Sequence, residues 1–307
     1  MAVRFETVDE NSDGQRLDNY LARVMRGVPK GRIYKALRKG EIRVNKGRAK
    51  ADYRLKHGDQ VRIPPVRQAD PRAPQPVPAH WKDTLEQAVL ASFPGVLVVN
   101  KPSGLAVHGG SGLNFGLIEA LRQQRPQERY LELVHRLDKD TSGCLLIARK
   151  ASALKDLHRQ LREGTMSKRY LALVAGRWPA RVRQISAPLE KNVLSSGERM
   201  VRVSAEGKPS LTEFSVVKRF HGATLIEARP VTGRTHQIRV HARHQGFPLL
   251  GDSKYSTEHT EQVAKSLGLK RLFLHASELH FDVEGKRRSV SAPLDSHLQH
   301  IIDRLEY

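Results

Sequence analysis

A run of prolines divides the chain into a short part and a long part. Residues 64–82 read PPVRQADPRAPQPVPAHWK, and their six prolines cannot continue a helix or a central strand. They favour the extended polyproline geometry of a semi-rigid spacer. We therefore predict a linker over residues 67–84, between a small N-terminal domain over residues 1–66 and a larger domain over residues 85–307.

The segment before the linker shows two amphipathic helices and then a basic strand and turn. Leu17 and Leu21 recur at helical spacing, and a second apolar stripe follows Pro29, which favours the start of a helix. After it, EIRVNKGRAK predicts a short strand with an Asn-Lys-Gly turn, and DQVRIPP predicts a last strand.

The same segment is strongly basic. From Arg26 to Lys56 it carries twelve Lys or Arg residues against two acids, whereas an ordinary solvated surface mixes the two signs. This pattern favours a small RNA- or DNA-binding module with non-specific affinity for phosphates. The residues that we expect to contact nucleic acid are Lys30, Arg32, Lys35, Arg38, Lys39 and Arg43.

The whole chain shares this bias, with a formal charge of +21. Such an excess favours a polyanionic partner, because each phosphate neutralised by Lys or Arg releases a counterion. A membrane-surface protein and an unusually soluble cytosolic protein are the alternatives. No stretch approaches the roughly 20 apolar residues that span a bilayer, and the N-terminus lacks the apolar centre of a signal peptide. We expect a monomeric, cytoplasmic protein without membrane contacts.

Few side chains suit a metal or redox centre. The single cysteine, Cys144, lies in an apolar run and excludes an internal disulfide. His236, His241 and His244 lie close together, but their spacing and the lack of a nearby acid make a weak metal site. The segment HGGSGLNFG matches neither a dinucleotide fingerprint nor a phosphate loop, and is interpreted as a loop beside a site. We expect chemistry without metal or cofactor.

The larger domain carries many short strand patterns and few helices. Segments such as GVLVVNK, CLLIA, KRYLALVAG and LFLHASELHFDV are continuously apolar or alternate. ALKDLHRQLREG predicts a helix with leucines on one face and Gly164 as its C-terminal stop. This order predicts an α+β fold, on a largely antiparallel mixed sheet with flanking helices and loops.

Two polar clusters interrupt these patterns. HRLDKDTSG, at 135–143, directly precedes an apolar strand, and PVTGRTHQIRVHARHQG, at 230–246, predicts a turn and then a helix with Arg239 and Arg243 on one face. An arginine partner stabilises an ionised aspartate, as a nucleophile or base requires. Tyr170, at the start of a following strand, would add an aromatic wall with a polar end. The plainer interpretation of the first cluster is a solvated turn with a chance salt bridge.

These motifs resemble those of the RluA-type pseudouridine synthases. HRLDKDTSG, KRYLALV and GRTHQIRVH occur in that order, and KPSGLAVHGGSGLNFG is most similar to the branch that modifies large-subunit ribosomal RNA. Residues 14–66 resemble the α-L RNA-binding domain first described in a small-subunit ribosomal protein. The chain departs from the family at Ser92–Gly95, where an acidic turn is common.

The resemblance implies an activity and a site. The chain would isomerise specific uridines of large-subunit (23S) ribosomal RNA to pseudouridine, after base flipping and without a cofactor. It implies that Asp138 is the catalytic aspartate, that Tyr170 stacks on the target base and that Arg239 pairs with the aspartate. Arg136 would help to extrude the nucleotide. The other expected RNA contacts in this domain are His135, Thr141 and Arg234.

Three questions stay open at this level. The aspartate would attack the sugar or the base, or abstract a sugar proton. A nucleic-acid glycosidase, which releases a free base, and a catalytically inactive RNA-binding assembly factor fit many of the same residues. Asp140 competes with Asp138, because side chains two apart on an extended segment point to opposite sides. The resemblance selects Asp138, and Asp140 is then expected to bond with the turn at Thr141–Gly143.

Overall fold

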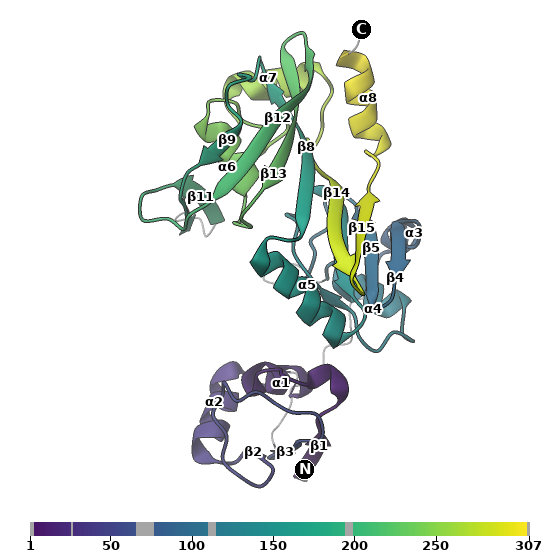
Figure 1. Ribbon diagram of the computed structural model, residues 1–307, viewed down its shortest axis with the longest axis vertical. Helices are drawn as coiled ribbons and strands as arrows, with labels where there is room; N and C mark the ends of the chain where they lie inside the picture. Colours follow the sequence, from purple (N-terminus) through teal and green to yellow (C-terminus); the bar gives the residue numbers. More distant parts are fainter. Residues whose placement is uncertain (1–2, 26, 66–76, 110–114, 194–198, 306–307) are drawn as a thin grey trace. The chain divides into compact units, whose positions relative to one another are not determined.

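The computed structural model describes residues 3–25, 27–65, 77–109, 115–193 and 199–305. These residues form two compact units, which divide between Val77 and Pro78 (Figure 1). Most of the expected linker, and the centre of the expected glycine-rich loop at 108–116, lie outside the described residues.

The end of the linker differs from the prediction. Helix α3 runs over Ala79–Gln87, so residues 79–84 are helical and not an extended spacer. Pro78 occupies the N-cap position with φ of −53°. Proline is compatible with a helix start because its missing N–H is not needed there. The last proline of the run therefore begins a helix instead of prolonging the spacer.

The first unit is a small three-stranded sheet with two helices. Its strands pair antiparallel in the order β1 (Arg4–Thr7), β3 (Gln60–Ile63) and β2 (Arg43–Val44). The helical elements are the one-turn η1 (Glu10–Ser12), α1 (Leu17–Val24) and α2 (Lys30–Lys39). The two helices and the strands β2 and β3 confirm the prediction. Strand β1 was not predicted, because its sequence RFET lacks the alternation of apolar and polar residues that marks a strand.

One apolar core holds the two helices to the sheet. Its buried side chains come from α1, α2, β2, β3 and the connecting segments, and include Leu17, Leu21, Ile33, Leu37 and Val61. Helix α2 begins after Pro29 and ends at Gly40, whose left-handed φ of +68° satisfies the last turn. Because the apolar side of α2 packs into this core, its lysines and Arg38 are exposed on the opposite side of the helix.

The second unit is built on a ten-stranded sheet within the described residues. Its strands are β4 (Val89–Phe93), β5 (Val96–Lys101), β6 (Glu132–Leu133), β7 (Ser142–Ala148), β8 (Ser167–Ala175), β9 (Gln184–Ser186), β12 (Leu211–Phe220), β13 (Ala223–Pro230), β14 (Leu274–Val283) and β15 (Lys286–Ser291). Eight of them follow the order β4-β5-β7-β14-β8-β13-β12-β9, while β6 pairs with β7 and β15 with β14. A separate ribbon joins β10 (Leu189–Val193) and β11 (Arg199–Val203).

The described pairs of the large sheet are antiparallel except that of β7 with β14. This arrangement confirms the predicted α+β class on a largely antiparallel mixed sheet. The departure at Ser92–Gly95 forms the tight connection between β4 and β5, at the outer edge of the sheet. Val96, next to this turn, pairs with Ala148 at the end of β7, whereas the HRLD segment precedes the start of β7.

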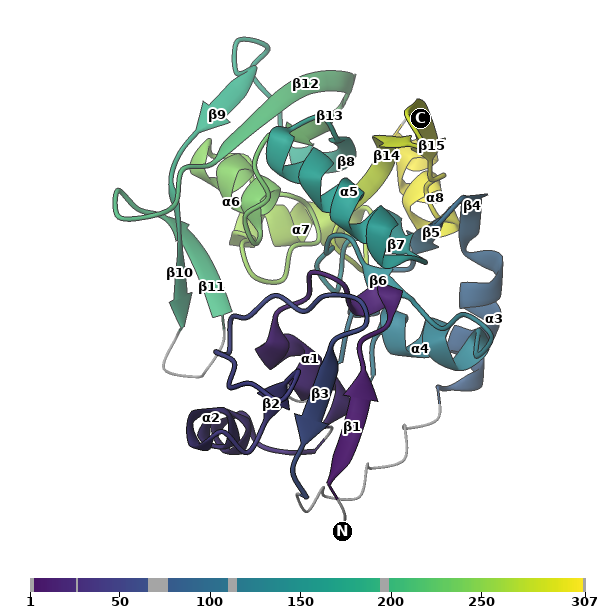
Figure 2. The same ribbon diagram turned by 60° about the horizontal axis from the view of Figure 1, so that its bottom comes forward.

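Five further helices flank this sheet in the described residues: α4 (Leu117–Gln124), α5 (Ala151–Glu163), α6 (Gln237–His244), α7 (Glu258–Ser266) and α8 (Ser296–Leu305). Helix α5, seen lengthwise in Figure 2, lies beside β14, where Gln160 Nε2 donates to the Asp282 carbonyl at 2.8 Å. Leu298 and Ile301 of α8 belong to the same buried apolar cluster as Leu225 of β13. No helix of the described ranges has the length and apolar composition to cross a membrane.

The parallel contact between β7 and β14 requires a glycine. Ser142 and Gly143 lie opposite His275 and Ala276. Gly143 has φ of +107°, and a Cβ atom there would lie 2.3 Å from the main-chain oxygen of Ala276. Only glycine combines that backbone conformation with such an approach. It allows the strand that follows the HRLD segment to join the centre of the sheet.

Candidate active site

The two polar clusters of the sequence meet in an ion pair. Nη1 of Arg239, on α6, donates to Oδ2 of Asp138, in the loop between β6 and β7, at 3.2 Å. The Arg239 side chain is 3% exposed, whereas that of Asp138 is 28% exposed. The predicted pairing of carboxylate and guanidinium is therefore present, with the carboxylate open to solvent and its partner hidden.

A second carboxylate holds Arg239, and sequence reasoning did not identify it. Nε and Nη2 of Arg239 donate to the two oxygens of Asp252 at 2.7 Å and 2.6 Å. The Asp252 side chain is fully buried, and its Oδ1 also accepts the main-chain N–H groups of Lys254 and Tyr255. The sequence offers only the pair Gly-Asp after two leucines as a signal.

The preceding glycine makes this clamp possible. Gly251 has φ of +73°, and a Cβ atom there would lie 2.0 Å from the main-chain oxygen of Arg271. Any other residue would push the turn away from its neighbour. The position of the Asp252 carboxylate therefore depends on a backbone path that only glycine can follow.

The environment keeps Arg239 charged. Burial alone would lower the pKa of Arg239, but the hydrogen bonds and charge of Asp252, and then those of Asp138, raise it above its ordinary value. Because the bidentate fork uses Nε and Nη2, Nη1 is the donor left for Asp138. Asp252 thus orients Arg239, and Arg239 orients Asp138.

His236 approaches the same carboxylate from the start of α6. Its backbone is left-handed, with φ of 54°, and Nε2 lies 3.8 Å from Oδ2 of Asp138. Nδ1 lies 2.8 Å from the Tyr255 hydroxyl, which accepts the main-chain N–H of Val201 at 2.9 Å. Burial lowers the pKa of His236, although the Asp138 charge opposes that shift. Sequence reasoning considered His236 only as a weak metal ligand.

Tyr170, on β8, is near enough to Asp138 to be affected by its charge. Its cross-strand neighbours are Ala228 on β13 and Ala276 on β14. These small side chains leave room beside the ring. The side chain is buried at 7% exposure, and burial together with the Asp138 charge raises the pKa of the phenol. Tyr170 therefore stays protonated near the carboxylate.

Two residues that were expected to contact RNA, His135 and Thr141, form hydrogen bonds within the protein. Nε2 of His135 accepts the main-chain N–H of Leu146 at 3.3 Å, and burial lowers the pKa of His135 to about 3. Thr141 is 2% exposed and donates its main-chain N–H to the Asp138 carbonyl at 3.2 Å. The burial of Thr141 contradicts the prediction that it contacts RNA. His135 is half-buried, but its Nδ1 is buried and its Nε2 bonds to the main chain, so neither ring nitrogen is free for RNA.

A buried lysine fixes the chain on the other side of Asp138. Nζ of Lys101 donates to the carbonyl oxygens of Pro102, Leu105 and Lys139 at 2.7, 2.8 and 3.0 Å. Three acceptors match the three donors of an ammonium group, although burial lowers the pKa of Lys101 to about 7. The lysine therefore joins the KPSG turn to the segment that carries Asp138.

Asp140 takes part in the same turn through its main chain. Its carbonyl oxygen accepts the hydroxyl of Ser103 at 2.8 Å and Nη1 of Arg271 at 3.4 Å. Both partners lie outside the turn at Thr141–Gly143, with which the prediction had paired Asp140. Asp138, by contrast, is engaged through its carboxylate, so the two aspartates occupy different environments.

The remaining predicted residues lie at the surface. Arg136 is exposed, two residues before Asp138, and the exposed Arg234 donates Nε to the Pro209 carbonyl at 3.2 Å. In the first unit, Arg32 is half-buried and pairs with Glu41 at 2.8 Å. The other predicted residues of that unit are exposed: Lys30, Lys35, Arg38, Lys39 and Arg43.

The histidines considered as metal ligands have other partners. The two ring nitrogens of the buried His241 lie 2.9 Å from the Thr212 hydroxyl and 3.0 Å from the Ala187 carbonyl. Across the part of the chain that the structure describes, no group of three His, Cys, Asp or Glu side chains could hold a metal ion. Cys144 is buried, and burial raises the pKa of its thiol to about 12.

Both units match known protein families. The RNA pseudouridylate synthase family matches residues 95–244, and the S4 domain matches residues 15–61. The chain is 53% identical over 307 residues to ribosomal large subunit pseudouridine synthase C of Pasteurella multocida, covering 99% of this chain and 94% of that protein. It is 52% identical over 310 residues to the protein of the same name from Escherichia coli, covering 99% and 97%.

Solved structures agree with these matches. Human RNA pseudouridylate synthase domain containing 4 aligns with a TM-score of 0.61 and 25% identity, over 74% of this chain and 96% of that one. Human RNA pseudouridylate synthase domain containing 1 aligns with a TM-score of 0.56 and 26% identity, over 71% and 94%. The chain therefore belongs to the RNA pseudouridylate synthase family, as an RNA pseudouridine synthase that carries an S4 domain in front of its synthase domain.

Proposed function

We propose that this chain isomerises uridine to pseudouridine in large-subunit ribosomal RNA, with Asp138 as its catalytic carboxylate and without a cofactor. The observation that carries the proposal is the solvent-accessible Asp138 carboxylate, held at 3.2 Å by the buried Arg239. The buried Tyr170 is near enough for the Asp138 charge to raise its pKa. The names of the curated relatives support the choice of RNA.

The reaction needs little beyond one ionised carboxylate. Pseudouridine forms when the C1′–N1 bond of uridine breaks, the uracil turns and C5 joins C1′, with no redox change and no net hydrolysis. A positioned carboxylate supplies the group that acts on the nucleoside and stabilises positive charge near C1′. Arg239 and Asp252 restrict the orientation of Asp138 before the substrate arrives.

The target base must leave its stack to reach Asp138. Extrusion costs about a few kcal/mol, which contacts in the pocket offset. Arg136 is exposed beside Asp138 and can enter the gap that the nucleotide leaves. The Tyr170 ring, with Ala228 and Ala276 beside it, offers a surface for the extruded uracil.

The S4 unit supplies general affinity for RNA. Its exposed cations on α2, among them Lys35, Arg38 and Lys39, suit contacts to phosphates, which position RNA without selecting its sequence. The choice of uridine then belongs to the synthase unit. Comparison of pseudouridines in ribosomal RNA from strains with and without the gene identifies the modified positions.

Two neighbouring aspartates provide the central test. Asp138→Asn keeps the size of the side chain and removes its charge, so we expect no release of tritium from RNA that carries 5-tritiated uridine, while RNA binding persists. Asp140→Asn is the matched control and should retain turnover, because Asp140 acts through its main chain. Substantial release by Asp138→Asn, or loss of release only in Asp140→Asn, would overturn the assignment.

The product separates this function from its rivals. A synthase leaves RNA of unchanged mass with tritium lost from C5. A glycosidase would liberate free uracil and leave an abasic site, and an RNA-binding assembly factor would give no product. Chromatography of the digested RNA therefore tests the reaction class independently of the aspartate variants.

A further inference from the structure

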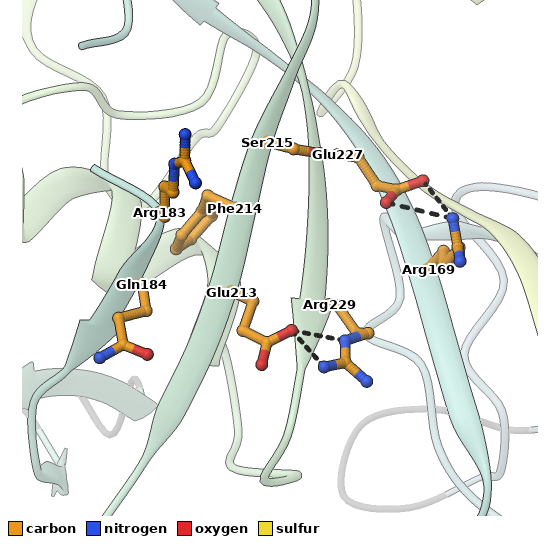
Figure 3. Close-up of a pocket in the computed structure, with 8 residues that line it drawn as sticks. All are labelled: Arg169, Arg183, Gln184, Glu213, Phe214, Ser215, Glu227 and Arg229. Atoms are coloured by element: carbon orange, nitrogen blue, oxygen red, sulfur yellow. Dashed lines mark hydrogen bonds and ion pairs between the residues drawn. The ribbon is translucent and has the colours of Figure 1, made fainter. Parts of the chain in front are cut away.

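Several exposed arginines of the synthase unit pair with a carboxylate. Figure 3 shows Arg229 bonded to Glu213, and Arg169 paired with Glu227 at 3.4 Å, around an open cleft of about 360 Å³. Arg183 lines the same cleft beside Phe214, and no dashed line joins it to the residues drawn. Paired arginines have their charge neutralised, so Arg183 stands out from its neighbours.

Arg183 belongs to a larger group of unpaired cations. The segment GRWPARVRQ, at 176–184, carries Arg177, Arg181 and Arg183 and no acid, and the turn between β12 and β13 adds His221. Within the described ranges none of these four side chains has a carboxylate partner. A cluster of like charges repels itself, so the group favours an anionic partner.

Part of this group converges on one cavity, which we call the arginine cleft and define by Arg177, Arg219 and His221. These three exposed side chains line a space of about 510 Å³ together with Phe220 and the main chain at Gly176 and Gly222. Two guanidinium groups in one cleft suit phosphate oxygens, which they bind through paired N–H donors.

The cleft is built on a rigid anchor. Trp178 is 1% exposed, and its ring lies 4.9 Å from the ring of Phe214 and 5.5 Å from that of Phe247. Its Nε1 donates to the Val182 carbonyl at 3.1 Å, and Nη2 of Arg219 donates to the Trp178 carbonyl at 3.3 Å. Cations that are already positioned lose less entropy on binding.

The arginine cleft is remote from the reacting base. Arg177 follows Tyr170 by seven residues along β8 and its end. At about 3.3 Å per residue, the five steps of β8 from Tyr170 to Ala175 alone span about 17 Å. A group at that distance cannot touch the target uridine, but it can hold RNA several nucleotides away.

We propose that the arginine cleft binds the phosphodiester backbone of the substrate RNA outside the target nucleotide. The proposal rests on the proposed function for the identity of the RNA. Bound there, the backbone would fix the direction in which RNA crosses the synthase unit, because the catalytic loop holds one point and the cleft holds another. An acidic protein segment is the competing ligand, and the experiment includes it.

The test compares two double variants of the full chain. Arg177→Gln/Arg219→Gln removes two charges from the cleft. Arg159→Gln/Arg287→Gln removes two exposed charges that pair with Asp156, Glu163 and Asp282. The affinity for unmodified large-subunit ribosomal RNA transcript is measured from about 0.05 to 0.3 M salt. Loss of two phosphate contacts should reduce the slope of log affinity against log salt by about 1.5, with about thirtyfold weaker binding near 0.1 M salt.

The control variant should keep both the wild-type slope and the wild-type single-turnover rate. Arg177→Lys/Arg219→Lys should restore most of the slope, since it retains the charge, and equal unfolding midpoints establish that the fold is intact. A cleft variant with the slope of the control would overturn the proposal. So would polyglutamate that binds the wild-type chain but not the cleft variant, while RNA binds both with the same salt slope. Wild-type protein that makes no pseudouridine would instead contradict the proposed function, while the salt slopes would still report on the cleft.

Discussion

Arg239 is bound more closely by Asp252 than by Asp138. Two hydrogen bonds of 2.6 and 2.7 Å join it to Asp252, and one of 3.2 Å joins it to Asp138. The guanidinium is therefore fixed by a residue that does not face the substrate. A donor that is in place before the reaction needs no reorganisation in the transition state.

The first prediction tests this clamp. Asp252→Asn should destabilise the synthase unit by about 3–5 kcal/mol, because it leaves the Arg239 charge buried with a weakened partner. Arg239→Gln should cost a similar amount, and the double variant should lose clearly less than the sum, as measured by urea unfolding. Asp282→Asn, at an exposed pair with Arg287, is the control and should cost below about 1 kcal/mol. Additive losses for Asp252 and Arg239 would show that the two residues are not coupled.

The second prediction concerns the glycine at the start of β7. Gly143→Ala should destabilise the synthase unit by about 3 kcal/mol or more, since its Cβ would meet the Ala276 carbonyl at 2.3 Å. Gly164→Ala, at the end of α5 with φ of +71° and open space around it, should cost only roughly 1–2 kcal/mol. Thermal unfolding of both variants measures the difference. Equal losses would mean that the positive φ matters and the contact with β14 does not.

The third prediction is a dependence on pH through His135. Its pKa is about 3 in the folded chain and about 6.5 when exposed, so the unfolded chain binds the extra proton between these values. The stability that His135 contributes is therefore present above about pH 6.5 and is lost as the pH falls toward 3. The nearby charge of Lys168 adds to the effect of burial.

Urea unfolding of wild type and His135→Gln between pH 7 and 4 measures this pH-dependent contribution to stability. The variant should lose less stability on acidification than wild type. The slopes of the free energy of unfolding against pH should differ by at most the contribution of one bound proton. The exposed His300→Gln should follow wild type. Identical pH slopes for wild type and His135→Gln would exclude His135 as the source.

The fourth prediction compares two arginines of α2. Arg38 is exposed, whereas Arg32 is half-buried and pairs with Glu41 at 2.8 Å. Arg38→Gln should reduce the slope of log RNA affinity against log salt by about 0.7–0.9, the value for one phosphate contact. Arg32→Gln should reduce it less, because its charge is already partly neutralised. The reverse order would assign the RNA contact to the other face of the helix.

The sequence predicted the centre of the site well, because its chemistry is local. HRLDKDTSG and GRTHQIRVH each gather several polar groups beside an element whose periodicity is clear, so their meeting at Asp138 and Arg239 followed from residue types. Tyr170 was placed correctly near the start of β8. Whether these residues have the proposed roles is a matter for the variants.

What the sequence could not predict depends on tertiary contacts. Asp252 is one acid among many until the fold buries it against Arg239. His135 and Thr141 are residue types that often bind RNA, and only their orientation shows that they serve the loop. Helix α8 was missed although Leu298, Ile301 and Ile302 recur at helical spacing, which is a signal that the sequence does contain.

The place of β14 in the sheet determines when the enzyme can become active during its synthesis. Residues 274–283 come late in the chain, yet β14 lies between β7, which follows the Asp138 loop, and β8, which carries Tyr170. Until that strand leaves the ribosome, the sheet remains two separate halves with unpaired edges, which are prone to wrong pairing. Asp138 and Tyr170 then belong to different halves. We therefore expect a chain that ends before residue 274 to leave Asp138 and Tyr170 apart and not to modify RNA.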